Sequence, residues 1–110
     1  MIEPGERPED AALREVREET GLAVERLYNI TVQPFYLHQH SAVMLAVVFA
    51  AIVSDTAPRL GPEHTRAEWL PIVDAERRFA WPRERANVRD AVELLRGGDA
   101  GKVEDVLRVK

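Results

Sequence analysis

The chain has 110 residues, which is enough for one small domain with its own hydrophobic core. Hydrophobic residues make up 45% and charged residues 31%, so the composition excludes an intrinsically disordered chain, and the lack of cysteine excludes disulfide and thiolate chemistry. The net charge of −4 argues against binding to a nucleic acid polymer, which requires a basic face.

The first predicted element is an amphipathic helix over residues 9–20. Pro8 suits the first position of a helix, and Glu9 and Asp10 suit the positive end of the helix dipole. Gly21 is a typical residue for ending a helix in the left-handed conformation.

A β-hairpin is predicted to follow. Residues 26–37 are rich in β-branched and aromatic types and predict a strand, in which Pro34 indicates an edge or a bulge. Residues 38–41 predict a turn. The nearly continuous apolar run over residues 42–53 predicts a central, buried strand.

That apolar run is also the longest in the chain, and it is shorter than the roughly 20 residues that a membrane-spanning helix requires. The N-terminus shows no basic patch followed by an apolar segment, so no secretory signal is predicted. We therefore expect a cytoplasmic protein with no membrane partner.

The C-terminal half predicts mainly loop and helix. The predicted elements are a loop over 54–65, a short strand over 67–72, one or two helical turns over 73–80, a second long helix within 81–98, and a short helix or frayed tail over 101–110. The fold class is therefore α/β or α+β, in one domain over residues 1–110.

Excess negative charge is concentrated in residues 1–22, which carry seven acidic and three basic residues, whereas the rest of the chain is balanced. Glu15, Glu18 and Glu19 fall within roughly a 100° arc of the predicted helix, where unpaired like charges cost about 0.2–0.5 kcal/mol per pair. The flanking arginines offset part of this cost, and a divalent cation would offset more. A solvated acidic face is the alternative interpretation.

The spacing in this segment resembles the signature of the Nudix hydrolases, G-x5-E-x7-R-E-U-x-E-E-x-G-U, where U is aliphatic. Eight of the nine specified positions match: Glu6, Arg14, Glu15, Val16, Glu18, Glu19, Gly21 and Leu22. The ninth, the first glycine, falls one position before Met1. The strands that precede it in the family are absent here, so we expect an N-terminally truncated domain: a misassigned start, a fragment or a natural short form.

The resemblance implies a Nudix-type α/β/α sandwich with a mixed sheet, and Mg²⁺ or Mn²⁺ as cofactor. It implies that Glu18 and Glu19 are the main metal ligands and that Glu15 is a further ligand or the general base. Glu6 and Arg14 would orient the other side chains.

Further candidates lie outside the motif. Glu63, in the predicted loop, rivals Glu15 as the general base, although a plain surface role is the alternative. His38 and His40 are candidates for contact with substrate, or form a polar turn. Tyr36 is a candidate for stacking on a nucleobase, or packs in the core.

The family resemblance implies hydrolysis of a nucleoside triphosphate, or of another nucleoside diphosphate linked to X, to a monophosphate and pyrophosphate. Residues 63–72 and 81–85 loosely resemble the branch that acts on dATP or dihydroneopterin triphosphate. A truncated, non-catalytic domain for binding or assembly is the alternative. In either case a missing neighbour for the strand over 42–53 would expose an apolar edge, which favours a homodimer.

Overall fold

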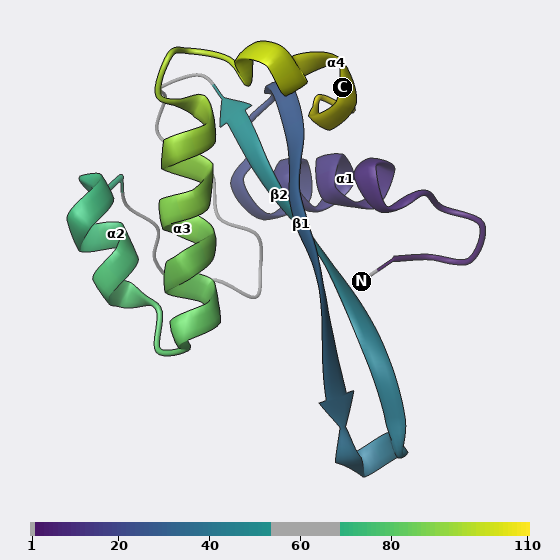
Figure 1. The fold of residues 1–110 in the computed structure, drawn as a ribbon. Coiled ribbons are helices and arrows are strands. Elements are labelled where there is room, and N and C mark those ends of the chain that lie inside the picture. The colour runs from purple at the N-terminus through teal and green to yellow at the C-terminus, as the bar shows by residue number, and fades with distance from the viewer. Residues whose placement is uncertain (1, 54–68) are drawn as a thin grey trace.

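The computed structural model describes residues 2–53 and 69–110. Its elements are α1 (Pro8–Thr20), β1 (Val24–Leu37), the 3₁₀ turn η1 (His38–His40), β2 (Ala42–Val53), α2 (Ile72–Arg78), α3 (Pro82–Leu95), the 3₁₀ turn η2 (Gly101–Val103) and α4 (Glu104–Leu107). Helix α1 lies across the base of the hairpin and α3 lies beside it, whereas the hairpin tip projects beyond both helices (Figure 1). The α/β class predicted from the sequence is confirmed.

Helix α1 begins and ends as the sequence predicted. Pro8 occupies the first turn, where its missing N–H removes no helical hydrogen bond, and Glu9 and Asp10 follow at the positive end of the dipole. Gly21 ends the helix with φ 71°, and its N–H donates to the carbonyl of Arg17 at 2.9 Å.

The hairpin is one antiparallel pair, with β1 joined to β2 through η1 and with Leu37 opposite Ala42. Both strands and the turn were predicted, but the predicted burial of β2 is wrong, because no residue of this strand is buried. Within the described residues β2 pairs only with β1, and the side chains of Val43 and Leu45 are each 69% exposed. An apolar run fixes the strand but not its number of neighbours, because neighbours come from elsewhere in the chain.

The described part of the C-terminal half is helical. Helices α2, α3 and α4 confirm the predicted helical turns, the second long helix and the short terminal helix. The predicted loop over 54–65 lies outside the described residues. The predicted strand over 67–72 is wrong where it can be seen, because residues 69–71 are irregular and Pro71 leads directly into α2. No described helix is long and apolar enough to cross a membrane.

Tyr28 is at the centre of the small core, which consists of Ala11, Leu22, Leu27, Tyr28 and Ala100. Its hydroxyl accepts a hydrogen bond from Arg26 Nη1 at 2.8 Å and donates one to Glu104 Oε2 at 3.1 Å. Burial, with the Glu104 bond, raises the pKa of this hydroxyl, so Tyr28 stays protonated and remains the donor. This network ties α4 to β1.

The end of the chain is held against β1 by backbone hydrogen bonds. The N–H of Leu27 donates to the carbonyl of Lys110 at 3.1 Å, and the N–H of Val109 donates to the carbonyl of Leu27 at 2.9 Å. Tyr28 and Arg108 form an isolated antiparallel bridge in the same region. The core therefore lies at the base of the hairpin, where it supports α1 and the acidic residues on it.

Candidate active site

Arg14 is the centre of the acidic cluster. Its Nε and Nη2 donate to the two carboxylate oxygens of Glu6 at 3.0 and 3.1 Å, which is the bidentate geometry that a guanidinium favours. Its Nη1 donates to Glu18 Oε2 at 3.1 Å, and its Nη2 lies 3.8 Å from Glu15 Oε1. One side chain on α1 thus joins the segment before the helix to two carboxylates on the helix.

These contacts set the charge state of the cluster. The Arg14 guanidinium holds the pKa of Glu6 below its usual range, and the backbone N–H of Glu3, 3.0 Å from Glu6 Oε1, lowers that pKa further. In turn the Glu6 carboxylate raises the pKa of Arg14. Glu6 is therefore ionised and fixed in place, which suits the orienting role that the motif implies for it.

Replacing Arg14 with methionine is expected to raise the pKa of Glu6 toward its usual value of 4.5. Because the folded-state pKa of Glu6 is lowered, its pairing stabilises the fold above the unfolded pKa, and that contribution is lost as the pH falls through the folded pKa. The difference in unfolding free energy between wild type and variant should therefore shrink below the usual glutamate pKa. Carboxyl NMR titration and urea unfolding across a pH series measure both effects.

Arg17→Met is the control for this change, because Arg17 is an exposed arginine on the same helix. It should leave the titration of Glu6 where it is in the wild type. A Glu6 pKa that does not move in Arg14→Met would contradict the assigned contact.

The three glutamates differ in how far they reach solvent. The side chain of Glu15 is 35% exposed and that of Glu18 58% exposed, and Glu19 is also exposed. Among residues 2–53 and 69–110, no three acidic or histidine side chains converge as metal ligands, and Glu18 instead contacts Arg14. The donor chemistry still fits Mg²⁺, which takes oxygen ligands and needs only one or two carboxylates beside waters and substrate phosphates.

The structure brings some predicted site residues together and separates others. Tyr36 is exposed on β1, and His38 and His40 form η1 at the hairpin tip, away from α1 (Figure 1). Their role in binding substrate stays a prediction. Glu63, the other candidate for the general base besides Glu15, lies outside the described residues.

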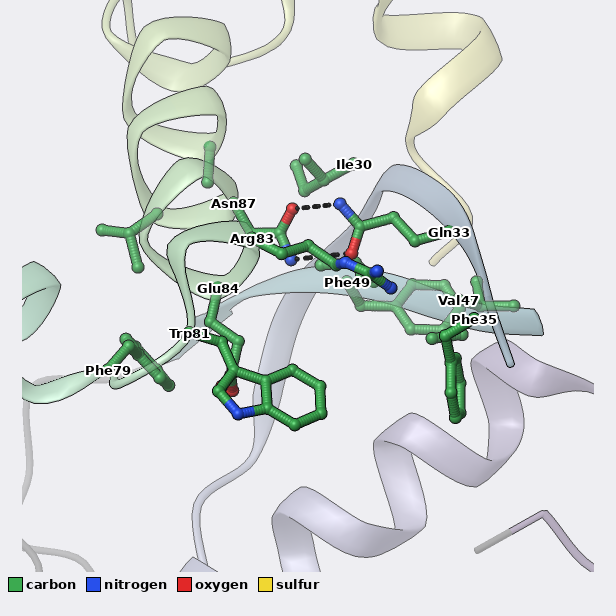
Figure 2. Close-up of a pocket in the computed structure, with 14 residues that line it drawn as sticks. Ile30, Gln33, Phe35, Val47, Phe49, Phe79, Trp81, Arg83, Glu84 and Asn87 are labelled. Atoms are coloured by element: carbon green, nitrogen blue, oxygen red, sulfur yellow. Dashed lines mark hydrogen bonds between the residues drawn. The ribbon is translucent and has the colours of Figure 1, made fainter. Parts of the chain in front are cut away.

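A cavity of about 490 Å³ lies between the hairpin and α3. Its walls are largely apolar and include the aromatic side chains of Phe35, Phe49, Phe79 and Trp81 (Figure 2). At its polar end Gln33 Nε2 donates to Asn87 Oδ1 at 2.9 Å, and Asn87 Nδ2 donates back to Gln33 Oε1 at 3.3 Å. Aromatic walls with a few fixed polar groups are typical of a site for a small organic ligand.

A second hollow of about 280 Å³ lies between β2 and the acidic helix. Glu15 and Ala12 line it on the α1 side. On the other side it shares Ala46, Val47 and Phe49 of β2 with the aromatic cavity. The two hollows therefore share three residues of β2 as lining, and Glu15 lines only the second hollow.

The two amide residues of the cavity were missed in the sequence. Gln33 and Asn87 are 54 positions apart, and no local pattern links two amides at that separation. The aromatic residues Phe79 and Trp81, placed just before the start of α3 at Pro82, were the signal that could have drawn attention to this region.

Comparison with known families agrees with this geometry. The family model described as NUDIX domain matches residues 1–91, a range that contains α1, the hairpin and most of α3. It includes the whole Arg14-centred cluster. The chain therefore belongs to the Nudix family, whose members are pyrophosphohydrolases that act on nucleoside diphosphates linked to a further group.

Proposed function

We propose that this chain is a Mg²⁺- or Mn²⁺-dependent pyrophosphohydrolase that cleaves a nucleoside triphosphate, or a related diphosphate, to a monophosphate and pyrophosphate. The observation that carries the proposal is the cluster of Glu6, Glu15 and Glu18 around Arg14 on α1. A cytoplasmic location is part of the same proposal.

Glu18 and Glu19 are the residues that would hold the cation, because both side chains are exposed on α1. When bound, the cation supplies positive charge that neutralises the phosphoanhydride oxygens. Glu18 Oε2 accepts from Arg14 Nη1, so Oε1 is the oxygen that Glu18 would offer to the cation. Arg14 also donates two hydrogen bonds to Glu6, which hold the guanidinium beside Glu15.

Glu15 is proposed as a further ligand or as the general base that takes a proton from the attacking water. Glu15 lines the hollow beside β2, and this supports the role because that hollow shares lining residues of β2 with the aromatic cavity. Glu63 is the rival base. Parallel Glu15→Gln and Glu63→Gln variants distinguish them, since loss of the base should remove the acidic limb of the pH–rate profile.

We place the part of the substrate beyond the phosphates in the aromatic cavity. Trp81 is 60% exposed, so its indole is available for stacking. Trp81→Ala is expected to raise KM by roughly tenfold, because stacking of a base on an aromatic side chain is worth about 1–3 kcal/mol. Mn²⁺ affinity should stay unchanged. Initial-rate kinetics and calorimetry make these two measurements.

Trp69→Ala is the matched control, because Trp69 is similarly exposed and does not line the aromatic cavity. Its KM should equal that of the wild type. Tyr36→Ala and His38→Ala test the rival substrate site at the hairpin tip. A KM that rises in these variants and not in Trp81→Ala would move the substrate from the cavity to the tip.

The direct test of the proposed function is pyrophosphate release from a panel of dNTPs, NTPs and a pterin triphosphate, with Mg²⁺ and with Mn²⁺. Metal-dependent turnover is expected. Preference for dATP or dihydroneopterin triphosphate would support the branch that residues 63–72 and 81–85 resemble. Mn²⁺ binding by calorimetry without any product would instead support a non-catalytic binding domain.

A further inference from the structure

The polar side chains that line the aromatic cavity differ in how much of their hydrogen-bonding capacity is already used. Gln33 and Asn87 satisfy each other through their two hydrogen bonds of 2.9 and 3.3 Å. Arg83 Nη1 donates to the carbonyl of Pro34 at 3.2 Å. Glu84 lines the same cavity, and its carboxylate has no hydrogen bond or ion pair with any described residue. Glu84 is therefore the lining residue with the most unused capacity for a ligand.

Glu84 is placed so that its carboxylate can act together with the Trp81 indole. Helix α3 begins at Pro82, and Trp81 precedes Glu84 by three positions, a spacing at which side chains of a helix are neighbours. Figure 2 shows the Glu84 side chain beside the indole. Glu84 is half-buried, whereas Trp81 is 60% exposed. A flat ring stacked on Trp81 would therefore bring one of its edges to the carboxylate.

A role at the start of the helix is the structural alternative for Glu84. An acidic side chain in the first turn is favourable beside the positive end of the helix dipole. In a capping box it would also accept the backbone N–H of the residue before the helix, but Glu84 makes no such bond to Trp81 in the described part of the chain. Neither role distinguishes one ligand from another, so the two interpretations predict different selectivity.

The chemistry of a carboxylate determines which ring edge fits beside it. An ionised glutamate only accepts hydrogen bonds, and its oxygens lie side by side, so its complement is a pair of adjacent N–H donors. A 2-amino-4-oxopyrimidine ring, which guanine and the pterins share, has this pair in its ring N–H and its amino group. Adenine instead places an acceptor nitrogen beside its amino group, and that nitrogen would face the carboxylate with no hydrogen between them. The carboxylate therefore favours the first edge and disfavours the second.

Arg83 supplies donors to the same cavity. A guanidinium carries several N–H donors and no acceptor, and within the described residues only the one from Nη1 to Pro34 is used. The oxo group of the 2-amino-4-oxopyrimidine ring is an acceptor next to the ring N–H, so it suits the donors that remain. Two consecutive residues of α3 thus complement the donors and the acceptor of this one ring edge.

We propose that Glu84 is a specificity-determining residue that accepts hydrogen bonds from the ring N–H and the amino group of a 2-amino-4-oxopyrimidine ring in the aromatic cavity. The substrate class is then a guanine nucleotide or a pterin triphosphate, and adenine nucleotides are disfavoured. This inference rests on the proposed function for the position of the ring. Guanine and pterin present the same edge, so Glu84 selects both, and turnover kinetics distinguish them.

The first test measures binding without turnover. Calorimetry on the unaltered protein with dGMP and dAMP, in the absence of a divalent cation, should show dGMP bound more tightly by roughly tenfold or more, because hydrogen bonds to a charged group are stronger than neutral ones. dIMP, which lacks the amino group, should bind more weakly than dGMP. An affinity for dGMP that is no greater than that for dAMP or for dIMP would overturn the proposal.

The second test uses Glu84→Gln, which keeps the shape of the side chain and replaces one acceptor oxygen with an amide donor. A glutamine amide matches the donor and the acceptor of adenine, so the preference for dGMP over dAMP should fall by about ten- to a hundredfold. Glu93→Gln is the control and should keep the wild-type preference, because Glu93 is exposed on the same helix, pairs with Arg96 at 2.9 Å and does not line the cavity. An unchanged preference in Glu84→Gln, or an equal loss of affinity for both nucleotides, would leave only the structural role and overturn the proposal.

Turnover kinetics separate this inference from the proposed function. With Mg²⁺, KM should be lower for dGTP or for dihydroneopterin triphosphate than for dATP, and the lowest KM identifies guanine or pterin as the ring. A preference for dGMP that Glu84→Gln removes, without turnover of any triphosphate, would support the inference and overturn the proposed function. Turnover with equal KM values for all three triphosphates would overturn the inference and leave the proposed function.

Discussion

Glu18→Gln is expected to lower metal-dependent turnover by roughly a hundredfold to ten-thousandfold. Loss of charge stabilisation worth several kcal/mol has this size, because each 1.4 kcal/mol corresponds to about tenfold in rate. Glutamine keeps the length and the shape of the side chain, so Arg14 Nη1, now 3.1 Å from the carboxylate, can still donate to a neutral amide oxygen. The fold should remain, because Glu18 is on the exposed face of α1.

Glu93→Gln is the matched control. Glu93 is also an exposed glutamate on a helix, and its carboxylate pairs with Arg96 at 2.9 Å, so the substitution removes the same charge from a comparable setting. Turnover should be unchanged in this variant. Calorimetry should show weaker Mn²⁺ binding in Glu18→Gln only. Equal turnover in the two variants would mean that Glu18 does not belong to the catalytic site.

The elements that were predicted correctly are those whose signals are local. Helix α1 has its start at Pro8 and its stop at Gly21 within one short segment, and the hairpin turn lies directly between two strands rich in strand-forming residues. β2 was predicted as a strand, but it was wrongly expected to be buried. Its apolar residues do not alternate with polar ones, so the sequence does not show which positions face solvent.

The same distinction applies to the candidate site. Glu15 and Glu18 belong to a pattern spaced along one helix, so their neighbourhood follows from the helical repeat. The contact between Arg14 and Glu6 bridges eight positions and was not predicted, because the family motif implied only that both residues orient the other side chains. The pairing of Gln33 with Asn87 depends on how α3 lies against the hairpin, and no local feature of the chain determines that placement.

The largest effect on stability is expected from Leu27→Ala. Leu27 is 1% exposed, and truncating a buried leucine to alanine costs about 2–5 kcal/mol, since apolar contacts are lost and a cavity remains. That is a large share of the roughly 5–15 kcal/mol that stabilises an ordinary domain.

Position 27 is also where the chain end is attached. The backbone of Leu27 bonds to Val109 and Lys110 on one side and is opposite Ala51 of β2 on the other, so loosening this point affects both neighbours. Urea unfolding should show a lower midpoint for Leu27→Ala, and amide exchange should show lost protection at Val109. Val106→Ala is the control, because the Val106 side chain is 75% exposed and its truncation should change the midpoint little. Equal unfolding free energies in the two variants would place the stabilising core elsewhere than at the base of the hairpin.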